Sequence, residues 1–213
     1  MVKPMRDALV ADTDTVFIWR HPRARGAEGR CIGRTDLAVD PRKAKRLAHR
    51  IRAFARRHGL PREVVTSPLR RCADVGRVLA AWGWQHRVDP ALIEVDFGGW
   101  DGQAWCDVPR FEIDAWCADL VGHRPGGGEN VGHLLARVSA WRPGTARLVV
   151  GHGGWLSAAQ WLTKPGCATA APRIAAVDWP PATAHGRCTP LRYAGADNPG
   201  QRWQGYTHAA SAP

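Results

Sequence analysis

Two histidines, each preceded by a short apolar run, are the residues of this chain best placed to do chemistry. Residues 16–19 (Val-Phe-Ile-Trp) lead into Arg20-His21, and residues 148–151 (Leu-Val-Val-Gly) lead into His152 and two further glycines. Open α/β sheets bind ligands beyond the carboxyl ends of their strands, so two such ends can direct both histidines into one pocket. An imidazole with an ordinary pKa of about 6.5 is largely neutral at pH 7 and can act there as a nucleophile or a proton carrier.

The elements that would position these histidines alternate between strands and helices, which predicts an α/β fold. We expect a three-layer sandwich, with a mostly parallel central sheet flanked by helices. Pro41 and Gly59 mark the two ends of an amphipathic helix, and Ser67 with Pro68 predicts the cap and first turn of another. Strands are expected at residues 15–20, 63–66, 84–88, 148–151, 173–179 and 189–193, and helices at 41–58, 69–82, 130–141 and 154–162.

The length of 213 residues and a hydrophobic content of 45% are enough for one sizeable core. We therefore expect a single domain over residues 15–193, after an N-terminal extension at 1–14 and before a flexible tail at 194–213. The region 93–128 is predicted to be a lid-like insertion with one short helix near residues 110–120. Its tryptophans, Trp100, Trp105 and Trp116, are expected to pack the insertion onto the core.

The chain is strongly basic, with 30 Lys and Arg against 19 Asp and Glu, a net charge of +11. Much of the excess lies at residues 41–71, where apolar residues recur at helical spacing and the basic residues occupy the other face. No zinc finger, helix-turn-helix or RNA-binding motif accompanies this face, so we expect it to steer a small anionic substrate rather than to bind nucleic acid.

The N-terminal residues and the cysteines indicate the compartment. Residues 1–14 mix charged and small residues, which predicts neither a signal peptide nor a membrane span. The six cysteines have no metal-like spacing, so reduced thiols and a cytoplasmic location are expected.

Four motifs occur in order along the chain and carry a resemblance. They are Arg20-His21, residues 67–71 (Ser-Pro-Leu-Arg-Arg), Glu94 ahead of residues 96–102 (Asp-Phe-Gly-Gly-Trp-Asp-Gly), and residues 151–153 (Gly-His-Gly). With them the chain resembles the histidine phosphatase superfamily, in its phosphoglycerate-mutase-like branch, over residues 16–162. The runs at 97–102 and 125–129 are most similar to α-ribazole phosphatases and related small phosphomonoesterases.

The resemblance implies a phosphatase that works through a phosphohistidine on His21, without a metal or a cofactor. Phosphoryl transfer needs an in-line nucleophile, cations around the phosphate oxygens and a proton for the leaving group. The implied catalytic residues are Arg20, His21, Arg71, Glu94 and His152, and the implied substrate-binding residues are Arg20, Arg71, Glu129, His152 and Gly153.

The motifs also imply how these roles are divided. Arg71 rather than Arg70 would hold the phosphate with Arg20, because it precedes the small residue of the motif. His152 would be a protonated donor beside the phosphate dianion. Glu94 would be the general acid and then the general base, with Asp96 as the second candidate.

The loop after His21 departs from the family pattern. Pro22, Ala24 and Ala27 stand where relatives carry Gly, Thr and Asn, so one backbone donor and two polar side chains are absent. Arg23, Arg25, Arg30 or Arg34 are candidates to replace those phosphate contacts.

We expect hydrolysis of a small phosphomonoester, with α-ribazole 5'-phosphate of cobalamin biosynthesis as the specific candidate. The alternatives are a cofactor-dependent phosphoglycerate mutase and a catalytically impaired phosphate-binding domain. A homodimer is also an expectation from the resemblance.

Overall fold

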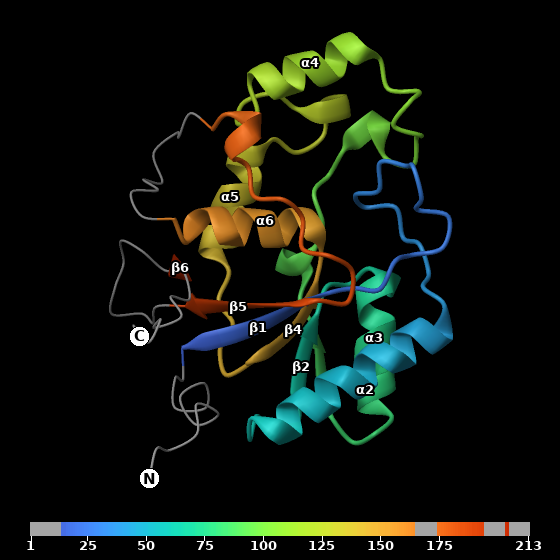
Figure 1. Ribbon diagram of the computed structural model, residues 1–213, viewed down its shortest axis with the longest axis vertical. Helices are drawn as coiled ribbons and strands as arrows, with labels where there is room; N and C mark the ends of the chain where they lie inside the picture. The colour runs from blue at the N-terminus through green and yellow to red at the C-terminus, as the bar shows by residue number, and fades with distance from the viewer. Residues whose placement is uncertain (1–13, 165–173, 194–202, 205–213) are drawn as a thin grey trace, which may run out of the picture.

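The computed structural model describes residues 14–164, 174–193 and 203–204. At its centre, the described strands form one six-stranded sheet with the order β3-β2-β4-β1-β5-β6 (Figure 1). Strands β3, β2, β4 and β1 pair in parallel, whereas β5 is antiparallel to β1 and β6 is antiparallel to β5. The strands are β1 (Thr15–Arg20), β2 (Glu63–Thr66), β3 (Gln85–Val88), β4 (Leu148–Gly151), β5 (Cys188–Tyr193) and β6 (Trp203–Gln204).

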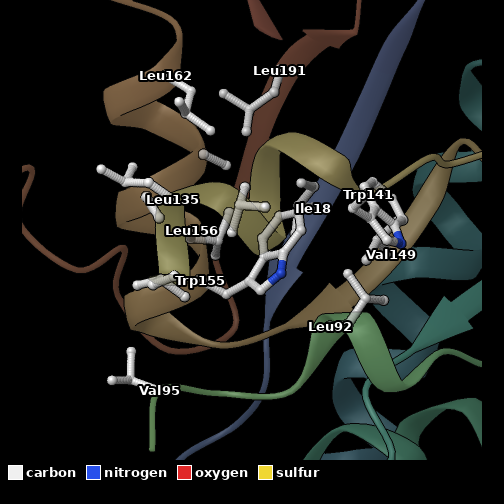
Figure 2. Close-up of a cluster of buried hydrophobic side chains, with 14 of the residues drawn as sticks. Ile18, Leu92, Val95, Leu135, Trp141, Val149, Trp155, Leu156, Leu162 and Leu191 are labelled. Carbon is white, nitrogen blue, oxygen red and sulfur yellow. The ribbon is translucent and has the colours of Figure 1, made fainter. Parts of the chain in front are cut away.

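Helices cover both faces of the sheet, which confirms the predicted three-layer sandwich. The side chains of β1 alternate, so that Phe17 and Trp19 pack under α2 (Pro41–Arg57) and α3 (Arg70–Ala80). Val16 and Ile18 point to the other face and pack under α5 (Val131–Ala140) and α6 (Gly153–Leu162). Figure 2 shows this second core, in which Trp155 of α6 lies among residues from the sheet and from α5.

The helix ends mostly follow the sequence signals, with one correction at α3. Asp40 caps α2 by accepting a hydrogen bond from the Arg42 N–H at 2.8 Å. Ser67 and Pro68 are not the cap of α3, because the helix begins at Arg70 and has no side-chain cap from its own N-cap residue. Instead Asp36, from the loop after β1, accepts the Arg70 N–H at 2.6 Å. The Ser67 hydroxyl instead bonds to the ring of His152.

The strand predicted at 173–179 is wrong for the residues that the structure describes there. Residues 176–178 form the 3₁₀ turn η4 (Ala176–Asp178), and none of residues 174–179 joins the sheet. The edge of β1 is already taken by β5, and Pro180 and Pro181 follow the segment and cannot donate ladder hydrogen bonds. Of the predicted tail, only β6 is described, and of the predicted N-terminal extension only residue 14.

The insertion consists of short elements held by aromatic packing. It contains η2 (Gly98–Trp100), α4 (Arg110–Ala118) and η3 (Pro125–Gly127), just after η1 (Pro90–Leu92), and α4 lies at the top of Figure 1 above α5. Trp100 is buried and its indole N–H donates to Glu112 at 2.7 Å. Trp116 packs edge-on against Trp100 and Phe97 and also against the core under α5 and α6, as predicted, whereas Trp105 is exposed. Among the described residues, no helix is long and apolar enough to cross a membrane.

Candidate active site

His21 and His152 meet at the carboxyl ends of β1 and β4. Strands β1 and β4 are neighbours, and the backbone N–H of His21 donates to the Gly151 carbonyl at 3.0 Å. The rings of His21 and His152 lie with their centroids 5.1 Å apart. The two residues therefore come together at one edge of the sheet, as predicted.

His21 is held as a neutral imidazole with one ring nitrogen free. Its Nδ1 lies 2.6 Å from the Pro22 carbonyl oxygen, which can only accept, so the proton is on Nδ1 and the lone pair is on Nε2. Burial lowers the pKa of His21 well below 6.5, and Arg71 lowers it further. Nε2 is thus an available nucleophile over the whole neutral range.

His152 is fully buried and both of its ring nitrogens are engaged. Arg71 donates its Nε–H to Nδ1 at 3.2 Å, so the His152 proton is on Nε2, which donates to the Ser67 hydroxyl at 2.7 Å. Burial and then Arg71 lower the pKa of His152 well below 6.5. His152 is therefore neutral without a neighbouring anion, and its protonation beside a phosphate dianion stays a prediction.

Arg71 is buried and its guanidinium is oriented by the loop at residues 33–35. Nη1 donates to the Thr35 carbonyl at 2.8 Å and Nη2 to the Gly33 carbonyl at 2.5 Å. That loop is fixed in turn by Asp101 of the insertion. Its carboxylate accepts the backbone N–H groups of Gly33, Arg34 and Thr35 at 2.6–3.0 Å and the Thr35 hydroxyl at 2.8 Å. Asp101 of the insertion therefore positions Arg71 indirectly, through residues 33–35.

Arg20 directly precedes His21, and part of its guanidinium has no hydrogen-bond partner among the described residues. Nη1 donates to the Thr183 carbonyl at 2.7 Å, whereas the buried Nε has no hydrogen-bond partner among the described residues. Burial lowers the pKa of Arg20, and the charge of Glu94 opposes that shift. A Cβ at residue 153 would lie 3.0 Å from the Arg20 Cζ, which is why the position beside Arg20 is the small Gly153. An unpaired guanidinium edge of this kind matches a phosphate.

Glu94 lies at the N-terminus of α6, where its carboxylate accepts three backbone N–H groups at 3.1 Å. Oε2 accepts from Gly154, and Oε1 accepts from Trp155 and Val95. The side chain is buried, and its charge acts on Arg20. Asp96, the second candidate acid, instead caps Gly98 and pairs with Arg34 at 3.0 Å. The structure thus favours Glu94 for proton transfer at this site.

Comparison with known protein families shows to which family this chain belongs. A model of the histidine phosphatase superfamily (branch 1) matches residues 16–173. The chain belongs to the histidine phosphatase superfamily. Its match spans the residues just described, from β1 through α6.

Relatives within and around the superfamily differ in length and activity. The bifunctional protein Rv2228c of Mycobacterium tuberculosis is 36% identical over 105 residues, which are 47% of this chain and 28% of that protein. The mycobacterial glucosyl-3-phosphoglycerate phosphatase Rv2419c has a TM-score of 0.65 and 25% identity over 90% of this chain and 96% of its own. The α-ribazole phosphatase of Shigella flexneri, at 21% identity, shares the fold with a TM-score of 0.64 over 84% of this chain and 91% of its own.

Glu129, which the family pattern assigns to substrate, is engaged with Arg137 in this member of the superfamily. Arg137 donates Nε and Nη2 to the two Glu129 carboxylate oxygens at 3.0 and 2.8 Å. Its Nη1 reaches the Ala91 and Ile93 carbonyls just before Glu94. The pair therefore anchors the segment that carries Glu94, and a role of Glu129 in substrate binding stays a prediction.

The four arginines named as replacements for missing phosphate contacts bond to other groups. Arg25 pairs with Asp40, Arg34 with Asp96, and Arg30 donates to the Gly102 carbonyl. Arg23 pairs with the exposed Glu28 at 3.2 Å, although it lies near enough to lower the pKa of Arg20. A contact of any of these four arginines with phosphate stays a prediction.

A third histidine, His185, lies at the site and is absent from the sequence predictions. Its ring centroid is 5.2 Å from that of His21, and its Nδ1 lies 3.1 Å from the His21 carbonyl oxygen. Residue 185 precedes β5, and because β5 is antiparallel to β1, the start of β5 lies where β1 ends. That pairing is the signal that would have found His185, since no motif surrounds it.

The remaining chemistry-bearing residues form no second centre in the described part of the chain. No group of three or more His, Cys, Asp or Glu residues is arranged to hold a metal ion there. Cys31, Cys72, Cys106, Cys117 and Cys188 are free thiols, and Cys167 lies outside the described residues. Burial raises the pKa of Cys72, whose Sγ lies 3.4 Å from His152 Nε2, so this thiol is a packing residue beside the histidine.

Proposed function

We propose that this protein hydrolyses a small phosphomonoester through a phosphohistidine on His21, without a metal ion. One observation carries the proposal. The buried, neutral His21 keeps Nε2 unprotonated in a site that also holds the Arg20 guanidinium, and Arg20 in turn lies within reach of the Glu94 charge. A nucleophile, a cation for the phosphate oxygens and a carboxylic acid are the groups that phosphoryl transfer to an imidazole requires.

In the first step, His21 Nε2 attacks phosphorus and the ester P–O bond breaks. Glu94 takes up a proton from solvent as the dianionic ester binds and passes that proton to the leaving oxygen, so the leaving group departs as an alcohol and Glu94 becomes a carboxylate. The transferred phosphoryl group carries its negative charge on oxygens that Arg20 and Arg71 neutralise. The Nδ1–H of His21 stays on the Pro22 carbonyl, which stabilises the positive charge on the phosphorylated ring.

In the second step, water attacks phosphorus on the side that the leaving group has vacated. Glu94 accepts a proton from that water, the P–N bond breaks, and Nε2 regains its lone pair. The hydrogen bonds from Gly154 and Trp155 keep the carboxylate in one orientation through both proton transfers. The site then releases inorganic phosphate and returns to its starting state.

An apolar cavity beside Glu94 supports a leaving group with an apolar ring. The cavity has a volume of about 230 Å³, and its wall includes Val95 and Gly154, which flank or bond to Glu94. Phe97, Trp116 and Trp179 line it, and its one charged side chain, Glu129, is paired. The planar, apolar dimethylbenzimidazole of α-ribazole 5'-phosphate suits such a cavity better than a sugar does, because a sugar needs many hydrogen-bond partners.

Turnover of a substrate panel in EDTA tests both levels of the proposal. The panel contains p-nitrophenyl phosphate, α-ribazole 5'-phosphate, glucosyl-3-phosphoglycerate and 3-phosphoglycerate, each with wild type, His21→Ala and His133→Ala. His133 is exposed on α5 and provides the matched control. We expect phosphate release in EDTA by wild type and control, a loss of at least about a thousandfold in His21→Ala, and the highest kcat/KM for the ribazole ester.

The intermediate is detected by mass spectrometry after an alkaline quench, which preserves phosphohistidine. One phosphoryl group on His21 is the expected result. Release that survives His21→Ala, or that EDTA abolishes, would overturn the mechanism. A clear preference for the glucosyl ester would retain the mechanism and overturn the substrate.

A further inference from the structure

His185 and His152 flank the nucleophile at nearly the same spacing. Their ring centroids lie 5.2 and 5.1 Å from that of His21. Loop residues 183–187 hold His185 there, because they also bond to β1 at Arg20. The Thr183 carbonyl accepts from the Arg20 guanidinium, the Gly186 N–H donates to the Arg20 carbonyl, and the Arg187 carbonyl accepts from the Arg20 N–H. The position of His185 is therefore fixed by the same backbone that delivers the nucleophile.

The two flanking histidines differ in what their rings can still bind. Both nitrogens of His152 are used, by Arg71 and by Ser67. His185 uses Nδ1 alone, as the donor to the His21 carbonyl, and its Nε2 has no hydrogen-bond partner among the described residues. Of the two, only His185 has a ring nitrogen ready for a ligand.

The loop after His21 supplies the reason why such a nitrogen is needed. Pro22 has no backbone N–H, and the side chains of Ala24 and Ala27 have no polar atoms. The backbone nitrogen of Pro22 and these two side chains therefore cannot donate a hydrogen bond to the phosphoryl group. The nearby arginines are bonded elsewhere, as described above. We propose that His185 is a phosphate-binding residue, whose Nε2 contacts the phosphoryl oxygens in place of the groups missing from that loop. The proposal rests on the proposed function, since it assigns a further contact in the same site.

Charges around His185 predict that the contact is linked to proton uptake. Burial, together with the charges of Arg20, Arg23 and Arg71, lowers the pKa of His185 to about 4. A neutral His185 with its proton on Nδ1 has a lone pair on Nε2, which repels the oxygens of a dianion. Binding a dianion therefore requires one proton on Nε2, and the dianion itself favours that proton.

Sulfate is a suitable probe, because it remains a dianion across the pH range of interest and needs no turnover. Its affinity and proton uptake are measured by isothermal titration calorimetry in two buffers of different ionisation enthalpy. His185→Asn is the informative variant, since an Asn amide can still donate to the His21 carbonyl from the Nδ1 position but has no counterpart of Nε2. His133→Asn is the matched control.

We expect wild type and His133→Asn to bind sulfate with uptake of about one proton at pH 7. In His185→Asn the affinity should fall about ten- to a hundredfold, as for loss of one charge-assisted hydrogen bond, and the proton uptake should disappear. The melting temperature of the variant should stay close to that of wild type.

Unchanged sulfate affinity and proton uptake in His185→Asn would overturn the inference, and would show that His185 only positions His21. Failure of wild type to bind sulfate would overturn it as well. If sulfate binds to wild type with proton uptake and both are lost in His185→Asn, but the wild type hydrolyses no ester, the phosphate-binding role of His185 would stand and the proposed hydrolysis would be overturned.

Discussion

Replacing Asp101 with Asn should weaken phosphate binding, although the hydrogen bonds of Asp101 go to residues 33–35 and not to His21 or His152. Its two oxygens accept four hydrogen bonds from residues 33–35, and the Gly33 and Thr35 carbonyls in turn orient Arg71. The Asn amide retains one of the two oxygens and points an N–H₂ group at donors that need an acceptor. Two of the four bonds are therefore lost.

The size of the effect follows from that count. At about 1–1.5 kcal/mol for each lost bond in this half-exposed position, the free energy of unfolding should fall by about 2–3 kcal/mol. For a chain of this length, that corresponds to a fall in Tm of roughly 4–12 °C. The loosened loop no longer fixes Arg71, and we expect the inhibition constant for inorganic phosphate to rise about tenfold.

The assay is competitive inhibition by phosphate, run alongside thermal unfolding at the same pH. Asp119→Asn is the control, since Asp119 also lies in the insertion but accepts only the Gly122 N–H at 2.9 Å. The control should keep the wild-type inhibition constant. An Asp101→Asn protein that loses stability but binds phosphate as wild type does would refute the link from the insertion to Arg71.

Three further predictions follow from the geometry of the site. Glu94→Gln should lower kcat by about 10²–10⁴-fold with a much smaller effect on phosphate inhibition, because it removes proton transfer and retains the shape of the side chain; steady-state kinetics with an ester of poor leaving group checks this. Gly153→Ala should raise KM more than it lowers kcat, because the new Cβ displaces the Arg20 guanidinium; equal effects on both constants would contradict that reading. The pKa values of His21 and His152 are lowered in the folded protein, so the unfolded chain takes up protons first as pH falls below 6.5. Each of these histidines should therefore lower the free energy of unfolding by about 1.4 kcal/mol between pH 7.5 and pH 5.5. Urea unfolding over this pH range should show the loss, and the loss should be smaller in His152→Asn.

The sequence predicted the parts of the fold and site whose signals are local. Apolar runs that end in Arg20-His21 and in His152 define two strand ends, and parallel pairing brings such ends together, so this convergence was predictable. Asn130 as the cap of α5 and Pro41 at the first turn of α2 were also predictable, because capping depends on neighbouring residues.

What the sequence did not predict depends on contacts between distant segments. Serine is a typical helix-cap residue, but the Ser67 hydroxyl bonds to His152. Asp36, from a different loop, accepts the first N–H of α3. Both ring nitrogens of His152 are engaged by partners 81 and 85 residues away. His185 belongs to the same class, because only the antiparallel pairing of β5 with β1 brings it to the nucleophile.

The antiparallel return of β5 to β1 also sets when the site is completed during synthesis. Arg20 leaves the ribosome among the first residues of the fold, yet its guanidinium is held by Thr183, a partner 163 residues later in the chain. Contacts of such long sequence separation close large loops and form late in folding. A nascent chain that ends before β5 has the nucleophile but lacks the loop that holds it. The candidate active site is therefore completed last beside the proposed nucleophile.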